Sequence, residues 1–208
     1  MDEVVVAVLA SGRGTRMGGP KILMRVGGQV WWRVQRRRLA GLGDRVRLIW
    51  IVSGIVEEAL SGEADAPGPR VLGDDSAPMF ESVRLAAKSV HESGESVGMF
   101  VLPVDVPVPS SGVFETLEET SRESGRSVPT RPQFENKTGH PVFLPAEWIA
   151  KIARMDEHEV RSRATTESMR LDRLIEGEVM SVEVEDAGVL VNLNTPEDVA
   201  AWVASATD

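Results

Sequence analysis

The sequence has 208 residues and no cysteine, so disulfides, thiolate metal sites and a cysteine nucleophile are excluded. A net charge of −9 would repel a nucleic acid duplex, and the apolar runs are strand-sized, well short of the ~20 residues that cross a bilayer. We therefore expect one domain without nucleic acid or membrane partners, and a cytoplasmic location because we find neither cysteines nor a secretory signal.

Strands and helices are predicted to alternate over residues 4–121. Continuous apolar, β-branched runs are typical of strands buried on both faces of a parallel sheet. The predicted strands are Val4–Leu9, Leu48–Val52, Arg70–Gly73 and Gly98–Leu102. The predicted helices are Val30–Leu42, Met79–Ser89 and Ser110–Ser121. This alternation predicts a doubly wound, mostly parallel α/β sheet.

The remainder of the chain is less regular. Thr195 is predicted to cap a final helix, with Pro196 at its first position and Asp198 completing a capping-box pattern. Before that helix we predict a polar loop, two strands and two helices. The loop is Arg122–Gly139, the strands are Val142–Leu144 and Met180–Val184, and the helices are Ala146–Met155 and a polar one over residues 158–176. Alternation in the second strand is typical of antiparallel pairing.

A glycine-rich loop, Ala10–Pro20, follows the first predicted strand. Glycines tolerate positive φ and let backbone N–H groups approach phosphate oxygens, and Arg16 and Lys21 can neutralise phosphate charge. A P-loop is excluded because Ile22, rather than serine or threonine, follows Lys21. The dinucleotide-binding fingerprint is excluded because Met17 occupies the place of its third glycine. The loop therefore predicts a phosphate site of another kind.

The segment Leu9–Lys21 resembles the signature of the nucleotidyltransferases that share a glycosyltransferase-A-like, Rossmann-like α/β fold. That signature reads leucine, alanine, a small residue, glycine, three residues, arginine-methionine-glycine, and then lysine. The resemblance implies catalytic roles for Arg16 and Lys21. It also implies a nucleotide-binding loop made of Leu9, Ala10, Ser11, Gly12, Arg13, Gly14 and Lys21. Within a single domain 1–208, residues 1–121 would form the half that binds the nucleoside triphosphate and residues 122–208 the half that binds the acceptor.

Asp105 follows the predicted strand Gly98–Leu102, at the edge of the sheet where the glycine-rich loop also emerges. A carboxylate at this position can hold Mg²⁺ together with waters and substrate phosphates. The segment Leu102–Pro107 resembles the family's metal-binding aspartate, which is followed by one residue and a proline. The resemblance therefore implies a catalytic, metal-binding Asp105, and the alternative is an aspartate that only shapes a turn before proline.

Three later segments resemble the molybdenum-cofactor branch of the same family. They are Met79–Arg84, Gly139–Phe143 and Asn192–Asp198. The resemblance implies acceptor contacts from Ser82, His140 and Asn192, and Mg²⁺ ligands in Asp105 and Asn194. An asparagine carbonyl can ligate Mg²⁺, although more weakly than a carboxylate. The alternatives are that His140 only packs or caps, and that the asparagines only arrange the start of the last helix.

The function that the resemblance implies is Mg²⁺-dependent transfer of a nucleoside monophosphate from GTP or CTP to a phosphate monoester, with release of pyrophosphate. The implied acceptor is molybdopterin or its metal-loaded form, and the implied protein partner is a molybdoenzyme or its chaperone. The ending Asn192–Asp198 favours GTP, whereas the step Gly139–Pro141 favours CTP. Two alternatives stay open: the same chemistry on a sugar phosphate, and a nucleotide-binding module without turnover.

Overall fold

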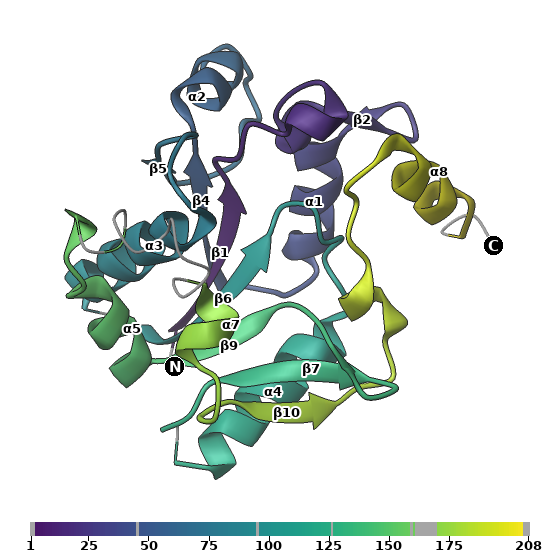
Figure 1. Cartoon of the computed structure of the whole chain (residues 1–208). Helices are drawn as coiled ribbons and strands as arrows, with labels where there is room; N and C mark the ends of the chain where they lie inside the picture. The colour runs from purple at the N-terminus through teal and green to yellow at the C-terminus, as the bar shows by residue number, and fades with distance from the viewer. Residues whose placement is uncertain are drawn as a thin grey trace.

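The computed structural model describes residues 3–44, 46–94, 96–125, 127–158, 160 and 170–205. Within these ranges, an eight-stranded sheet runs through the molecule with helices on both faces (Figure 1). Its strands are β1 (Glu3–Ala10), β4 (Val46–Val52), β5 (Arg70–Leu72), β6 (Ser96–Pro103), β7 (Thr130–Phe134), β8 (Lys137–Thr138), β9 (Val142–Pro145) and β10 (Met180–Glu183). A separate hairpin pairs β2 (Arg25–Val26) with β3 (Gln29–Val30).

Helices alternate with strands along the chain, as predicted for an α/β fold. They are α1 (Trp31–Ala40), α2 (Gly54–Leu60), α3 (Met79–Ser93), α4 (Ser111–Glu123), α5 (Ala146–Ala153), α7 (Leu171–Leu174) and α8 (Pro196–Ser205), with short 3₁₀ turns η1 (Thr15–Met17), η2 (Lys21–Leu23) and η3 (Ala187–Leu190). None of the helices in the described ranges combines the length and apolar character needed to cross a membrane.

The order of strands in the sheet is β10-β7-β9-β6-β1-β4-β5, with β8 paired to β7. In the half that contains β1, the strands are parallel: β1 pairs with β4 and β6, and β4 pairs with β5. Strand β9 then runs antiparallel to β6. The carboxyl ends of β1, β4 and β6 therefore open at one edge of the sheet, where α/β proteins bind their ligands.

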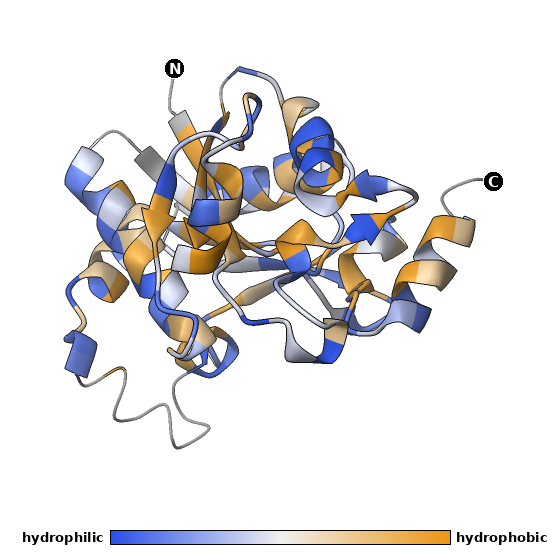
Figure 2. Ribbon diagram, turned by 90° about the horizontal axis from the view of Figure 1, so that it is seen from above, coloured by the Kyte–Doolittle hydropathy of each residue, from blue (hydrophilic) through white to orange (hydrophobic). Residues whose placement is uncertain are grey.

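Side chains of β1 alternate between two apolar cores. Val4, Val6 and Val8 pack with residues of α1, α2 and α4, whereas Val5 and Ala7 pack with residues of α3 and α5. All five side chains are at most 2% exposed. Figure 2 shows the apolar residues gathered on the strands and on the helix faces turned toward them. Burial on both faces confirms the doubly wound, mostly parallel sheet that the apolar runs predicted.

Two predictions about the second half were wrong. The segment Arg122–Gly139 is not a loop: α4 continues to Glu123, and β7 and β8 form a hairpin whose turn residues Glu135 and Asn136 have φ of 49° and 63°. The strand predicted at Met180–Val184 exists as β10, but it runs parallel to β7. Of the helix predicted over residues 158–176, residues 159 and 161–169 lie outside the described part of the chain.

Candidate nucleotide-binding site

The glycine-rich loop leaves the carboxyl end of β1 and turns back on itself through η1. Gly14 has φ of 59°, and a Cβ at this position would collide with the Gly19 carbonyl oxygen. The Gly14 carbonyl accepts hydrogen bonds from the N–H groups of Met17 at 2.8 Å and Gly19 at 3.2 Å. Only glycine fits this crowded, left-handed position without strain.

Backbone donors of this loop are available to a ligand. Among the described residues, no acceptor is found for the N–H groups of Gly12, Arg13 and Gly14. Successive N–H groups in such a turn form a concave site for anions. The Arg13 guanidinium lies 3.2 Å from Asp75, and its side chain is 57% exposed. The Arg16 side chain is also exposed. The loop can therefore meet an anion with both backbone dipoles and side-chain cations.

Lys21 connects the loop to two acceptors from distant parts of the chain. Its Nζ donates to Asp105 Oδ2 at 2.8 Å and to Asn194 Oδ1 at 2.7 Å. The side chains of Lys21 and Asp105 are 16% and 23% exposed, so this ion pair is only partly screened by water. The structure thus brings together the lysine, the aspartate and the second asparagine that the sequence singled out separately.

Backbone hydrogen bonds align the two acceptors. The N–H of Leu193 donates to the carbonyl of Asp105 at 2.8 Å, which docks the asparagine segment on the turn after β6. The predicted capping box then fixes the start of α8. The Asp198 carboxylate accepts from the N–H of Asn194 at 2.9 Å and of Thr195 at 2.8 Å, and the Asp198 N–H donates to Thr195 Oγ1 at 3.2 Å. The hydroxyl of Thr195, and then these N–H groups, lower the pKa of Asp198.

The residues around Lys21 fit a divalent cation. One ammonium contacts both oxygens, so a carboxylate and an amide oxygen converge on a position that a cation can occupy. Oxygen ligands of these two kinds suit Mg²⁺ and Mn²⁺. Within the described ranges, no cluster of three or more His, Asp or Glu side chains is placed to hold a metal. A divalent cation held by Asp105 and Asn194 would therefore complete its coordination with water and phosphate oxygens.

Two adjoining cavities lie at this edge of the sheet. The smaller, of about 180 Å³, is lined by the loop, Lys21, Asp105 and the first turn of α3. Its wall includes Ser11 and Ser82, whose buried hydroxyls are 2.7 Å apart. The structure therefore places Ser82 beside the glycine-rich loop. Leu9, Met79 and Pro103 line both cavities, so the two spaces meet at the ends of β1 and β6.

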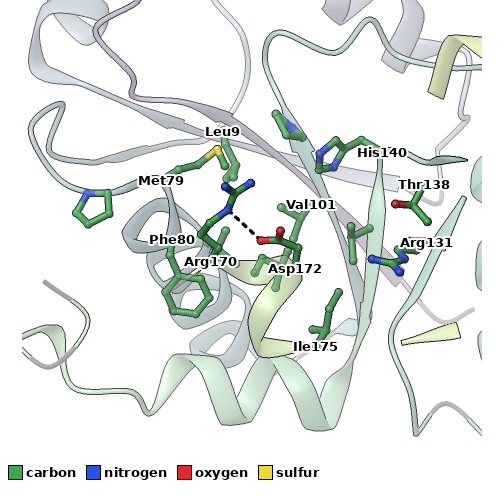
Figure 3. Close-up of a pocket in the computed structure, with 16 residues that line it drawn as sticks. Leu9, Met79, Phe80, Val101, Arg131, Thr138, His140, Arg170, Asp172 and Ile175 are labelled. Carbon is green, nitrogen blue, oxygen red and sulfur yellow. Dashed lines mark hydrogen bonds and ion pairs between the residues drawn. The ribbon is translucent and has the colours of Figure 1, made fainter. Parts of the chain in front are cut away.

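The larger cavity measures about 480 Å³ and has a mostly apolar lining. Arg131, Thr138 and His140 lie on one side of it, and the Arg170–Asp172 ion pair, at 3.2 Å, lies on another (Figure 3). Among the described residues, the solvent-shielded Nδ1 of His140 has no hydrogen-bond partner. Burial lowers the pKa of His140, and the negative charges of Asp105 and Asp172 oppose that shift only in part. His140 is therefore predominantly neutral at pH 7.

The remaining predicted residues lie at the cavities or at the surface, except Ala10. Ala10 is 2% exposed, packs in the apolar core and lines neither cavity. Leu9, Ser11, Gly12, Gly14, Lys21, Ser82 and Asp105 line the smaller cavity, and His140 lines the larger one. Arg13, Arg16 and Asn192 are exposed at the surface, and Asn192 donates to the Leu190 carbonyl at 3.2 Å. Sequence reasoning missed Arg131, Arg170 and Asp172, because no motif distinguishes them from other surface charges.

The structure has the fold of known nucleotidyltransferases. It is similar to Rv0371c from Mycobacterium tuberculosis H37Rv, with a TM-score of 0.72 and 18% identity over 97% of this chain and 98% of that one. Molybdopterin-guanine dinucleotide biosynthesis protein A from Archaeoglobus fulgidus has a TM-score of 0.67 and 16% identity, with 98% of each chain covered. CMP:2-keto-3-deoxy-manno-octonic acid synthetase, complexed with CTP, has a TM-score of 0.69 and 14% identity, with 99% of each chain covered.

The family follows from the sequence match. Residues 6–173 match the model of the MobA-like NTP transferase domain, and the chain belongs to this family of nucleotidyltransferases. No curated protein sequence matches it significantly. The match begins within β1 and ends within α7, and it includes the glycine-rich loop, Asp105 and the walls of both cavities apart from Ile175. It ends before Asn192 and Asn194, so the asparagine segment lies beyond the matched region.

Proposed function

We propose that the chain transfers a nucleoside monophosphate from GTP or CTP to a phosphate monoester of the molybdopterin type and releases pyrophosphate. The observation that carries this proposal is the contact of Lys21, which directly follows the glycine-rich loop, with both Asp105 and Asn194. That contact joins a site for phosphate to a site for a cation. Such a pairing suits a reaction in which one polyanion attacks another.

In the proposed reaction, an oxygen of the acceptor phosphate attacks the α-phosphorus of the nucleotide. The bond from the α-phosphorus to the bridging oxygen breaks, and pyrophosphate carries away the electron pair. The acceptor needs no strong general base, because a phosphate monoester has a second pKa near ~6 and is largely a dianion at pH 7. The proposed reaction therefore requires no nucleophilic triad in the protein.

Residues of this chain would bind the nucleotide and neutralise its charge. The N–H groups of Gly12 and Gly14 would donate to phosphate oxygens, with Arg16 and Lys21 as cations. Asp105 and Asn194 would hold Mg²⁺, which when bound supplies Lewis acidity and charge neutralisation. One structural neighbour, Rv0371c, is known as a complex with manganese, at a TM-score of 0.64 and 18% identity over 98% of this chain and 99% of that one.

The larger cavity supports an acceptor with an apolar or flat body. Its lining includes Phe80, Val101, Val142 and Ile175, which offer few partners for the hydroxyls of a sugar. Arg131 lies at the same cavity and can meet an anionic group. A flat ring can pack on these apolar side chains, so this lining supports molybdopterin as the proposed acceptor. A molybdoenzyme or chaperone partner, and a cytoplasmic location, remain predictions from the sequence.

The test is pyrophosphate release from GTP and from CTP with three acceptors: molybdopterin, a sugar 1-phosphate, and none. Each reaction is run with Mg²⁺ and with EDTA. We expect release only with Mg²⁺ and molybdopterin, and one of the two nucleotides to be preferred. Faster release with the sugar phosphate would overturn the proposed acceptor. Nucleotide binding without pyrophosphate release under any condition would identify a binding module instead.

A further inference from the structure

A fully buried glutamine in α1 contacts the backbone on both sides of Asp105. Gln35 is 0% exposed. Its Nε2 donates to the carbonyls of Val106 at 2.7 Å and Val104 at 3.3 Å, and its Oε1 accepts from the N–H of Val108 at 3.0 Å. Three backbone groups within five residues therefore depend on one side chain, and Asp105 lies between two of them.

The segment after β6 needs these partners because it has left the sheet. Val104, Val106 and Val108 are each at most 8% exposed and belong to the same apolar core as α1. Their backbone polar groups are therefore shielded from water, and leaving such groups unpaired is costly. Asp105 sits between two of these buried valines, and its carboxylate reaches Lys21. Rotating the segment about its axis would expose a valine and move the carboxylate.

The same helix also contacts the element that follows Asn194. Trp31 Nε1 donates to the Val104 carbonyl at 2.6 Å, and the Trp31 ring packs edge-on against Trp202 of α8 at 5.3 Å between centroids. About two turns further along α1, Arg38 donates to the Val108 carbonyl at 2.7 Å and lies 5.8 Å from the Trp202 ring. Helix α1 is thus a common support for the turn that carries Asp105 and for the helix that Asn194 precedes.

We propose that Gln35 is a positioning residue that fixes the Asp105 carboxylate for the divalent cation. This inference rests on the proposed function of Asp105 as a metal ligand. Gln35 touches neither nucleotide nor metal in this role, and it acts through the Val104–Val108 backbone. Partners that orient a metal ligand commonly change metal affinity by about 10- to 100-fold when removed. A glutamine that only stabilised the core would lower stability and leave metal affinity unchanged.

The experiment measures Mn²⁺ binding and compares three variants with the parent. Gln35→Leu removes all three hydrogen bonds at similar volume. Thr130→Val is the matched control, because Thr130 is also 0% exposed and donates to one backbone carbonyl, that of Leu117 at 3.1 Å, in the α4–β7 region. Asp105→Asn removes the proposed ligand charge. Mn²⁺ is titrated by electron paramagnetic resonance with the α,β-methylene analogues of GTP and of CTP, and melting temperatures and nucleotide affinities in EDTA are measured alongside.

We expect Gln35→Leu to weaken Mn²⁺ binding by about tenfold or more, with nucleotide affinity in EDTA within about twofold of the parent because the loop contacts are untouched. Thr130→Val should lower the melting temperature without changing Mn²⁺ affinity. Mn²⁺ binding by Gln35→Leu at the parent affinity, or equal weakening by Thr130→Val, overturns the role of Gln35. Parent-like Mn²⁺ binding by Asp105→Asn instead overturns the proposed metal site itself.

Gln35→Met covers the case in which Gln35→Leu is insoluble. Methionine is unbranched and flexible, so it can fill the space of glutamine, but its thioether cannot donate to the Val106 carbonyl. We expect this variant to weaken Mn²⁺ binding as well. Unchanged Mn²⁺ affinity in folded Gln35→Met overturns the inference, and failure of both variants to fold shows a residue required for the core rather than for positioning.

Discussion

Replacing Lys21 by methionine should raise the affinity for a divalent cation without nucleotide and lower turnover with it. In the structure the Lys21 ammonium lies 2.8 Å from Asp105 Oδ2 and 2.7 Å from Asn194 Oδ1. A divalent cation that uses those oxygens must displace the ammonium. A hydrogen bond that involves a charged group contributes ~1.5–3 kcal/mol, and ~1.4 kcal/mol changes a binding constant tenfold. Without nucleotide, Lys21→Met should therefore bind Mn²⁺ roughly 10- to 100-fold more tightly.

With nucleotide bound, the loss of Lys21 should reduce catalysis, because Lys21 then has phosphate oxygens to neutralise. Turnover of Lys21→Met should fall by about 10²- to 10³-fold, the usual cost of removing one preorganised group that stabilises developing charge. Calorimetric Mn²⁺ titration without nucleotide and pyrophosphate release with it measure the two effects. Lys137→Met, on the exposed hairpin, is the control for loss of one positive charge. If Lys21→Met binds Mn²⁺ no more tightly than the parent, the ammonium does not occupy the cation position.

Three further predictions follow from the site and its surroundings. Asp105→Asn should abolish Mg²⁺-dependent turnover and weaken nucleotide binding only when Mg²⁺ is present, because a metal held by carboxylate and phosphate couples the two affinities; equal weakening in EDTA would identify a structural turn residue. Asn194→Asp should raise Mg²⁺ affinity, since ligand charge tunes affinity for hard cations, and an unmoved titration midpoint would remove Asn194 from the site. The third prediction concerns how Asp186 contributes to the stability of the protein at low pH. Burial raises the pKa of Asp186, but hydrogen bonds from Ser110 and Gly188 and the positive charge of Arg38 have the larger combined effect, so the pKa is lowered. Its stabilisation is therefore present above the unfolded-state value of ~3.9 and is lost as the pH falls through the lower folded-state value. Urea unfolding of Asp186→Asn at pH 7 and pH 3 should show a smaller free energy of unfolding than the parent at pH 7 and a smaller difference at pH 3; an equal difference at both would contradict this.

The parallel half of the sheet could be predicted because its strands are apolar on both faces. Predicted strands at Val4–Leu9, Leu48–Val52 and Gly98–Leu102 correspond to β1, β4 and β6 within two residues at each end. Helix α2 was not predicted, since it has only seven residues. The hairpin β2–β3 was missed because each strand has two residues. The spacing of apolar residues identifies a helix or strand only when the segment is longer than these.

The second half was harder because its strands do not carry the usual pattern. Strand β7, Thr130–Phe134, contains Arg131, Pro132 and Gln133, a composition that predicts a loop. Its proline is tolerated because β9 pairs with β7 only at Thr130. Strand β10 was predicted to be antiparallel from its alternation, but alternation reports one buried and one exposed face, not direction. At the end of the sheet, where β10 lies, a parallel strand can also have an exposed face.

The glycine-rich loop and Asp105 could be predicted as one site because both follow strands that end at the same edge of a parallel sheet. The contact between Lys21 and Asn194 spans 173 positions, and no local pattern encodes it. The role of Gln35 was not predicted, because a glutamine on a helix rich in arginine is expected to be exposed at the surface. Its burial and three backbone partners become visible only when α1 packs against the turn after β6.

The contacts of Lys21 would let the proposed polyanion and cation bind together to a chain with a net charge of −9. Phosphate must draw Lys21 away from Asp105, and that step alone leaves a partly buried carboxylate without its cation. A divalent cation must displace Lys21, and that step alone leaves the ammonium without its anion. Binding both ligands satisfies both groups, so each should raise the affinity of the protein for the other by the same factor. Lys21→Met removes the shared group, so the nucleotide should then raise Mn²⁺ affinity by a smaller factor than it does in the parent. An undiminished factor would mean that the nucleotide and the metal are coupled only through direct coordination of phosphate.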